Sequence, residues 1–361
     1  MLALIPTTGD TSKLRFAVFG EMQFNRVLLK GTIMLNIGLL GAGRIGQVHA
    51  VNIDRHTDTR ITAVSDVYAP AAEALAAQYG TDVRSSDDII ADASIDAVLV
   101  ATSTDTHSDL IEAATAAGKA VLCEKPVDLS LERARACLKT ATANGQPVMI
   151  GFNRRFDPSF AALKAAFDAG EIGKGELLAV TSFDPAPPPV AYVKVSGGIF
   201  RDMTIHDFDI CQWLMGGLPE TVTAKASSIV DPEIGAEGDF DTAVITLTYA
   251  DGRIATIRNS RRAAFGYDQR IELLGSEGML QAENMPEHLV KKSTIDGVTG
   301  AKPMLFFLER YMPAYAAEWD AFVTALKDDS PMPATLEEGV AALAVAEAAT
   351  ESAKTGQSVT L

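Results

Sequence analysis

Two short stretches of the sequence carry side chains whose types and spacing suit acid–base chemistry on a hydroxyl group. In the first, Asp202 and His206 lie four residues apart, so on a helix they would share one face among apolar neighbours. Such a pair suits an imidazole general base whose orientation or charge is held by a carboxylate. A histidine that serves only packing is the competing interpretation. A zinc site is not predicted, because no further Cys or His lies close by.

Lys125 lies in the second stretch, Glu124-Lys125-Pro126, directly after an apolar run that is typical of a buried strand. A lysine at the carboxyl end of a parallel strand points into the crevice where ligands bind. There it can orient a substrate hydroxyl and stabilise negative charge that develops on oxygen. The alternative is an exposed surface lysine.

A glycine-rich turn predicts that a dinucleotide binds beside these residues. An apolar stretch runs directly into Gly41-Ala42-Gly43-Arg44-Ile45-Gly46, and a helical pattern follows. The glycines allow a tight turn, close approach of the backbone to a pyrophosphate, and close packing of helix on strand. The N–H groups of the first helical turn then face the phosphates. The expected contacts from this turn are Gly41, Gly43, Arg44, Ile45 and Gly46.

Asp66 indicates which dinucleotide this is. It ends a second apolar strand, where a carboxylate can accept hydrogen bonds from the adenosine ribose hydroxyls and repel a 2′-phosphate. Its neighbour Val67 offers no cation to hold such a phosphate. NAD is therefore expected rather than NADP, with a strand-end cap as the alternative role of Asp66.

Small polar residues follow the next strand, in Thr102-Ser103 and, a little further on, His107. Polar groups at the carboxyl end of a parallel strand line the ligand crevice. We expect Thr102, Ser103 and His107 to border the cofactor together with Glu124 and Lys125. Taken alone, His107 is interpreted as structural, because it begins a helical segment and can cap or pack there.

The elements that must position these residues alternate between strand and helix from Met34 onward. Strands are expected over 35–40, 60–66, 97–100, 119–123 and 147–151, and helices over 44–55, 70–79, 86–92, 106–117 and 130–143. Such alternation implies right-handed crossovers and a doubly wound parallel (Rossmann) sheet, so the fold class is α/β. We expect residues 34–150 to form an NAD-binding domain.

After residue 150 the pattern changes to that of an α+β domain with a largely antiparallel open sheet. Strands are expected over 175–183, 220–230, 241–250, 253–262, 268–275 and 278–283, and helices over 158–169, 202–215, 304–326 and 334–354. We assign residues 151–361 to substrate binding and oligomerisation. Residues 1–33 are expected to be an N-terminal extension rather than a signal peptide. Either Met34 is the natural start, or these 33 residues are a dispensable extension.

The bulk composition excludes several classes of partner. A net charge of −16 over 361 residues argues against nucleic acid or an anionic membrane surface, because both need a basic face. Three cysteines without a CxxC pair indicate a reducing, cytoplasmic setting. No apolar run reaches the roughly 18 residues of a membrane span.

The glycine-rich turn, Glu124-Lys125-Pro126 and the Asp202–His206 stretch together resemble the glucose–fructose oxidoreductase/inositol dehydrogenase (Gfo/Idh/MocA) family. The similarity covers residues 34–361. The stretches 151–157 and 196–209 look most like the inositol 2-dehydrogenase branch. The resemblance implies that Lys125, Asp202 and His206 are catalytic and contact the substrate, together with Arg154 and Tyr267. Phe265 stands where some inositol dehydrogenases carry a tyrosine, which leaves one polyol contact open.

The activity implied by this resemblance is NAD-dependent oxidation of a secondary hydroxyl on a cyclic polyol, with myo-inositol as the leading substrate. His206 would take the hydroxyl proton, Lys125 would position the oxygen and Asp202 would orient the pair. The family also implies a homotetramer, and no metal is required. The alternatives are a dehydrogenase for another inositol isomer or sugar, and a non-catalytic NAD-binding regulator. The presence of Lys125, Asp202 and His206 argues against the regulator.

Overall fold

The strands expected in the first half of the chain build a six-stranded parallel sheet in the order β3-β2-β1-β4-β5-β6. The computed structural model describes residues 34–361, so the expectations for residues 1–33 lie outside the described residues. The strands are β1 (Leu35–Leu40), β2 (Thr59–Ser65), β3 (Asp82–Val83), β4 (Ala97–Val100), β5 (Ala120–Glu124) and β6 (Val148–Gly151). The predicted doubly wound sheet is confirmed, with the short β3 as an addition.

The order of this sheet decides where a ligand can bind. From β1 the chain moves outward through β2 and β3, then crosses back to β4 on the other side of β1. The carboxyl ends of β1 and β4 therefore flank a topological switch point, where crevices open in such sheets. The intervening helices are α1 (Arg44–Arg55), α2 (Ala69–Tyr79), α3 (Ser86–Ala91), α4 (His107–Ala116, after the 3₁₀ turn Thr104–Thr106) and α5 (Leu131–Asn144).

The second sheet has seven strands in the order β12-β11-β7-β10-β9-β8-β15. Its neighbours run antiparallel except β7 and β10, so the largely antiparallel sheet is also confirmed. The strands are β7 (Gly175–Phe183), β8 (Thr221–Ser227), β9 (Thr242–Thr248), β10 (Ile254–Ser260), β11 (Asp268–Gly275), β12 (Gly278–Ala282) and β15 (Val359–Thr360). Along β9, buried Ala243, Ile245 and Leu247 alternate with Val244, which is 50% exposed. One face is thus covered and the other is open.

The remaining elements lie before, between and after these strands. They are the 3₁₀ turn Asn153–Phe156, α6 (Pro158–Asp168), α7 (Val190–Ser196), α8 (Ile199–Asp202), α9 (Ile205–Met215), α10 (Pro232–Ala236), the hairpin β13 (Lys292–Thr294) and β14 (Gly297–Thr299), α11 (Phe307–Asp328) and α12 (Leu336–Thr355).

The expected single helix over 202–215 is wrong. The N–H of Thr204 bonds back to the Ile199 carbonyl at 2.9 Å and closes α8, so a break separates Asp202 from His206.

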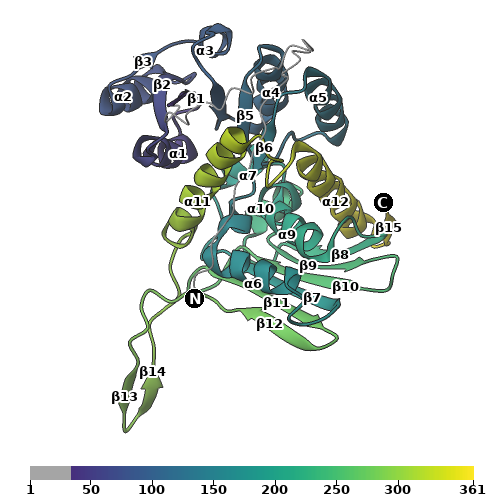
Figure 1. Ribbon diagram of the computed structural model, residues 1–361. Helices are drawn as coiled ribbons and strands as arrows, with labels where there is room; N and C mark the ends of the chain where they lie inside the picture. The colour runs from purple at the N-terminus through teal and green to yellow at the C-terminus, as the bar shows by residue number, and fades with distance from the viewer. Residues whose placement is uncertain (1–33) are drawn as a thin grey trace, which may run out of the picture. The chain divides into compact units, whose positions relative to one another are not determined.

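The last two long helices return to the first sheet (Figure 1), where α11 packs on α1 and α12 packs on α5 and β6. Trp319 on α11 donates its indole N–H to Thr59 on β2 at 3.3 Å. The N–H of Ile150 on β6 donates to the Ala334 carbonyl just before α12, at 2.9 Å. Residue 150 lies within β6, the last strand of the first sheet, and its role as a domain boundary stays a prediction. Within residues 34–361, we find no helix of the length and hydropathy needed to cross a bilayer.

Candidate functional site

The glycine-rich turn after β1 forms a cradle that side chains would fill. Gly41 has a φ of +105°, and a Cβ there would lie 2.3 Å from the Ala101 carbonyl oxygen. A Cβ on Gly46 would lie 2.0 Å from the Gly41 oxygen, whereas Gly43 faces open space. Helix α1 begins at Arg44 without a side-chain cap, so its first N–H groups are available to an anion. The residues present therefore fit a dinucleotide pyrophosphate.

Asp66 lies at the edge of this cradle and also holds its shape. One carboxylate oxygen accepts from the Ala42 N–H at 2.6 Å, and the other accepts from the Tyr68 N–H at 2.8 Å. Val67 beside it is fully exposed and supplies no positive charge. A carboxylate fixed at this strand end meets the requirement for recognising a ribose diol.

The segment after β4 borders the same crevice, and His107 lies beneath it. Thr102 is half-buried and pairs its hydroxyl with that of Thr106 at 2.7 Å, while Ser103 is exposed. The His107 ring is 1% exposed, with Nδ1 2.8 Å from the Pro126 carbonyl and Nε2 3.3 Å from the Thr102 carbonyl. Because a neutral imidazole carries one N–H, it donates to one of these two carbonyls at a time, and His107 links the segments after β4 and β5.

Lys125 and Asp202 meet across the crevice. The Lys125 Nζ donates to the Asp202 backbone carbonyl at 2.7 Å and lies 3.7 Å from its carboxylate. Tyr192 on α7 donates its hydroxyl to Oδ1 of the same carboxylate at 2.8 Å. Arg261 lies 3.3 Å from the other oxygen, Oδ2. The Asp202 side chain is therefore committed to these groups rather than to the His206 ring.

His206 is half-buried at the start of α9, edge-on to Phe152 with ring centroids 6.3 Å apart. Burial lowers the pKa of the His206 imidazole well below its usual value, and the positive charges of Lys125 and Arg154 add to this effect. The ring is therefore neutral at physiological pH. Its buried Nδ1 has no hydrogen-bond partner among the described residues. A neutral imidazole beside a lysine is ready to accept a proton.

Arg154 and Tyr267, which the family resemblance implies as substrate contacts, both lie against the ring of Tyr311. The Arg154 guanidinium pairs with buried Asp207 at 2.6 Å and lies 5.9 Å from the Tyr311 ring centre. Tyr267 stands edge-on to that same ring, at 6.0 Å. Phe265 is 53% exposed in the turn before Tyr267. The structure thus brings the Arg154 and Tyr267 positions together.

Three further residues of the crevice, Asp184, Tyr192 and Arg261, were missed in the sequence. Asp184 follows β7 and Arg261 follows β10, and because these strands are parallel their ends lie side by side, with the Asp184 N–H on the Ser260 carbonyl. Burial raises the pKa of Asp184 to about 6, with Arg261 opposing the shift and Asp202 adding to it. A polar residue directly after each strand was the available signal for two of them.

A glycine-rich turn at a switch point, an acidic strand end and the neighbouring Lys125, Asp202 and His206 are the features expected of an NAD-dependent dehydrogenase. Two family models match the chain: "Oxidoreductase family, NAD-binding Rossmann fold" over residues 35–152, and "GFO/IDH/MocA C-terminal domain" over residues 160–281. The chain belongs to the Gfo/Idh/MocA family of oxidoreductases, as the sequence motifs predicted.

Relatives within the family cover nearly the whole described chain. Inositol 2-dehydrogenase of Rhizobium meliloti is 50% identical, over 88% of this chain and 96% of the relative. Myo-inositol 2-dehydrogenase of Thermotoga maritima is 43% identical, over 91% and 98%. The solved structure of scyllo-inositol dehydrogenase from Lactobacillus casei, with bound NAD(H) and scyllo-inositol, is 30% identical, covers 91% and 99%, and has a TM-score of 0.84.

Proposed function

We propose that this protein is an NAD-dependent inositol 2-dehydrogenase that oxidises myo-inositol to its 2-keto product. The observation that carries the proposal is the meeting of Lys125, Asp202 and a neutral His206 at the crevice beside the glycine-rich turn. The inositol dehydrogenases named above support the substrate class. Other inositol isomers and sugars remain the alternatives within the family.

Each residue of the trio has a distinct part in the reaction. Bound NAD supplies the hydride acceptor, at C4 of its nicotinamide. His206 accepts the proton of the substrate hydroxyl as the carbon–oxygen double bond forms and the hydride leaves carbon. Lys125 donates to the reacting oxygen and stabilises the negative charge that develops there. Asp202, held by Tyr192 and Arg261, keeps the lysine ammonium in place.

The groups around the crevice suit a ligand that carries many hydroxyls. Lys125, Arg154 and Arg261 can only donate hydrogen bonds, whereas Asp184 and Asp202 accept them when ionised. Because every hydroxyl of a polyol both donates and accepts, donors and acceptors in one site satisfy several hydroxyls at once. This arrangement supports a cyclic polyol over an apolar alcohol.

A spectrophotometric assay with a panel of polyols tests the proposal. The protein is mixed with NAD and, in turn, myo-inositol, scyllo-inositol and glucose, and NADH formation is followed by its absorbance. The expected result is turnover with the highest kcat/KM for myo-inositol. A higher value for another compound reassigns the substrate, and NAD binding without turnover on any compound would favour the regulator.

Changing Asp66 to Ser is expected to shift cofactor preference from NAD toward NADP. The shorter neutral side chain removes the repulsion of a 2′-phosphate and also the contacts to the Ala42 and Tyr68 N–H groups. The measurement is kcat/KM for NAD and for NADP in both proteins, with Asp66→Asn as the variant that keeps the side-chain shape. An unchanged ratio in the Ser variant would place the ribose contact elsewhere.

The titration of Asp184 is expected to make substrate binding depend on pH. With a pKa near 6, its carboxylate is lost as the pH falls through that value, so kcat/KM for the polyol declines there. Asp184→Asn is expected to lower kcat/KM at pH 8 and to remove the inflection. An inflection that persists in this variant would assign the titration to a different group.

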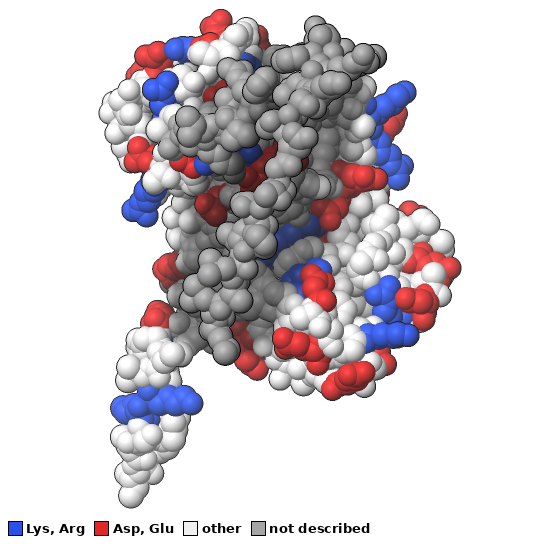
Figure 2. Space-filling model, viewed as in Figure 1, with Lys and Arg blue, Asp and Glu red and all other residues white. Residues whose placement is uncertain are grey.

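We propose that the chain assembles as a homotetramer. The open face of the second sheet exposes Val244, Leu274 and Met279. Leu289 before β13 and Ile295 in the β13–β14 turn are exposed as well. Figure 2 shows this hairpin as a mostly uncharged projection with one basic band. Light scattering after size exclusion measures the assembly, and a monomer would contradict it.

We also propose that residues 34–150 hold NAD, that residues 151–361 bind the substrate, and that the protein is cytoplasmic. The match of the NAD-binding family model to residues 35–152 supports the first assignment. Cys123, Cys137 and Cys211 are free and buried, which suits a reducing compartment.

A further inference from the structure

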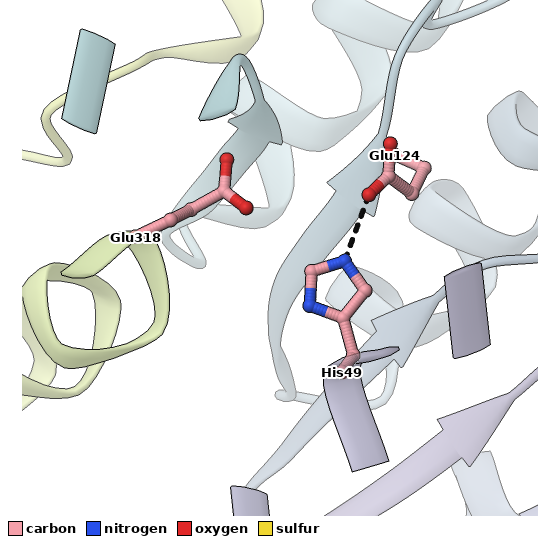
Figure 3. A group of neighbouring side chains, drawn as sticks. All are labelled: His49, Glu124 and Glu318. Atoms are coloured by element: carbon pink, nitrogen blue, oxygen red, sulfur yellow. Dashed lines mark hydrogen bonds and ion pairs between the residues drawn. The ribbon is translucent and has the colours of Figure 1, made fainter. Parts of the chain in front are cut away.

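Three ionisable side chains meet at the end of β5, one residue before Lys125 (Figure 3). His49 comes from α1, Glu124 ends β5 and Glu318 comes from α11. One ligand atom from each lies within 4.8 Å of the others, and His49 Nε2 is 2.7 Å from a Glu124 oxygen. His49 and Glu318 are both 0% exposed.

Glu318 is the unexplained member of this cluster. Its carboxyl group points toward Glu124 and His49 in Figure 3, yet neither of its oxygens has a hydrogen-bond partner among the described residues. Burial raises the pKa of Glu318 well above its usual value, and the charge of Glu124 raises it further. Tyr315, which stands edge-on to His49 at 5.6 Å, adds no positive charge. Two ionised carboxylates here would repel each other, because no lysine or arginine of residues 34–361 offsets the effect of Glu124 on Glu318.

A single proton resolves this repulsion more simply than a metal ion. A metal would have to replace the short contact between His49 Nε2 and Glu124. It would also leave His49 Nδ1 without the partner that metal-bound histidines almost always have, since this atom has none in the described chain. A protonated Glu318 instead becomes a donor, aimed at a carboxylate that already accepts from His49.

The cluster is connected to catalysis through the backbone of Glu124-Lys125-Pro126. Glu124 is held by His49, the Lys125 Nζ by the Asp202 carbonyl at 2.7 Å, and the Pro126 carbonyl by His107 at 2.8 Å. Glu318 faces the contact between Glu124 and His49. A change at Glu318 therefore reaches Lys125 through a single intervening residue.

We propose that Glu318 is a positioning residue for the dehydrogenase site: it is a neutral carboxylic acid that shares its proton with Glu124. Together with His49, it fixes the strand end that presents Lys125. The kinetic consequence rests on the proposed function, but the protonation state of Glu318 does not. The protonation state of Glu318 can therefore be tested by thermal unfolding, without an activity measurement.

Thermal unfolding of Glu318→Gln at several pH values tests whether Glu318 is protonated in the folded protein. A carboxyl group whose pKa is raised by folding contributes its full stabilisation of the folded state when the pH is below the ordinary pKa of the group. This contribution is lost as the pH rises through the raised pKa. Glutamine does not titrate, so the Tm of the variant relative to wild type is expected to increase as the pH rises above the ordinary range of a glutamate. The exposed Glu347→Gln on α12 is the matched control, with no such trend.

The opposite trend, with Glu318→Gln increasingly less stable than wild type as the pH rises, would show an ionised Glu318 and overturn the proposal. A loss of wild-type Tm on adding EDTA that the variant does not share would overturn it in favour of a metal site. Infrared difference spectra provide a direct readout, because the carbonyl band of a protonated carboxyl must disappear in Glu318→Gln.

Kinetics then test the positioning role. Glu318→Gln can still donate to Glu124, so its kcat is expected to match wild type near neutral pH and to persist further into the alkaline range. Glu318→Leu fills the space without a donor and is expected to lower kcat about tenfold, a change of about 1.4 kcal/mol in the barrier, with KM for NAD unchanged. Equal kcat in the Leu and Gln variants, with both folded, would contradict positioning.

Discussion

Replacing His206 by Ala lowers kcat for inositol oxidation by about 10²- to 10⁴-fold, the range for loss of a general base. The reason is that the imidazole is held neutral by burial and by the nearby charges of Lys125 and Arg154, so it is the group ready to take the hydroxyl proton. NAD affinity is expected to stay nearly unchanged, because the glycine-rich turn lies on a different element. Stopped-flow or steady-state kinetics with fluorescence titration of NADH measure both quantities.

The matched control is His288→Ala, which removes an exposed imidazole from the loop before β13 and should leave kcat as it is. His206→Asn adds a second comparison, since it keeps polarity but cannot act as a base near neutral pH. If turnover survives in His206→Ala with normal folding, the proton must leave through another group, and Lys125 becomes the next candidate. A parallel loss of NAD affinity would instead assign His206 to binding.

The parts of the fold that the sequence predicts are those dictated by local pattern. The strand–turn–helix around Gly41–Gly46 could be recognised because backbone approach to a pyrophosphate demands glycine at fixed positions. The alternation of apolar and polar residues similarly predicted β9 to β12, although it could not show that β7 runs parallel to β10. That pairing depends on which strands meet after a long connection, and no local signal records it.

The candidate site was predictable only where residues adjoin a strand end. Lys125 and Asp66 were found in this way, whereas the partners of Asp202 were not, because Tyr192 lies on a short helix beyond a proline-rich loop. The break between α8 and α9 also escaped prediction, since the helical period continues through Met203 and Thr204. Glu318 is the extreme case: its neighbours His49 and Glu124 are far away in sequence, and only the return of α11 brings them together.

The largest expected effect on stability comes from Arg155, one residue along from the predicted substrate contact Arg154. Its guanidinium is almost fully buried and makes a two-pronged ion pair with Asp209, the shortest N–O distance being 2.6 Å. It also donates to the Pro333 carbonyl at 2.8 Å and to Glu338 at 3.1 Å. One side chain thereby ties α9 to the start of α12.

Arg155→Ala is expected to lower the free energy of unfolding by about 3–5 kcal/mol, because it leaves the Asp209 carboxylate buried and unpaired. That is a large part of the roughly 5–15 kcal/mol that stabilises a folded domain. Asp209→Ala should cost less, because the guanidinium keeps its contacts to the Pro333 carbonyl and to Glu338. Chemical denaturation of the two single variants and of the double variant gives the coupling between them.

The double variant should cost less than the two single variants added together, because removing both partners leaves neither charge stranded. Arg155→Lys is expected to fall between wild type and Arg155→Ala, since an ammonium keeps the charge but cannot make the two-pronged contact. Strict additivity would mean that the pair contributes through packing against Phe152 and Trp213 alone, whose rings lie about 6 Å from the guanidinium. Because Arg155 does not reach Lys125 or His206, the fraction of Arg155→Ala that remains folded should keep wild-type kcat, which separates this stabilising pair from the catalytic group.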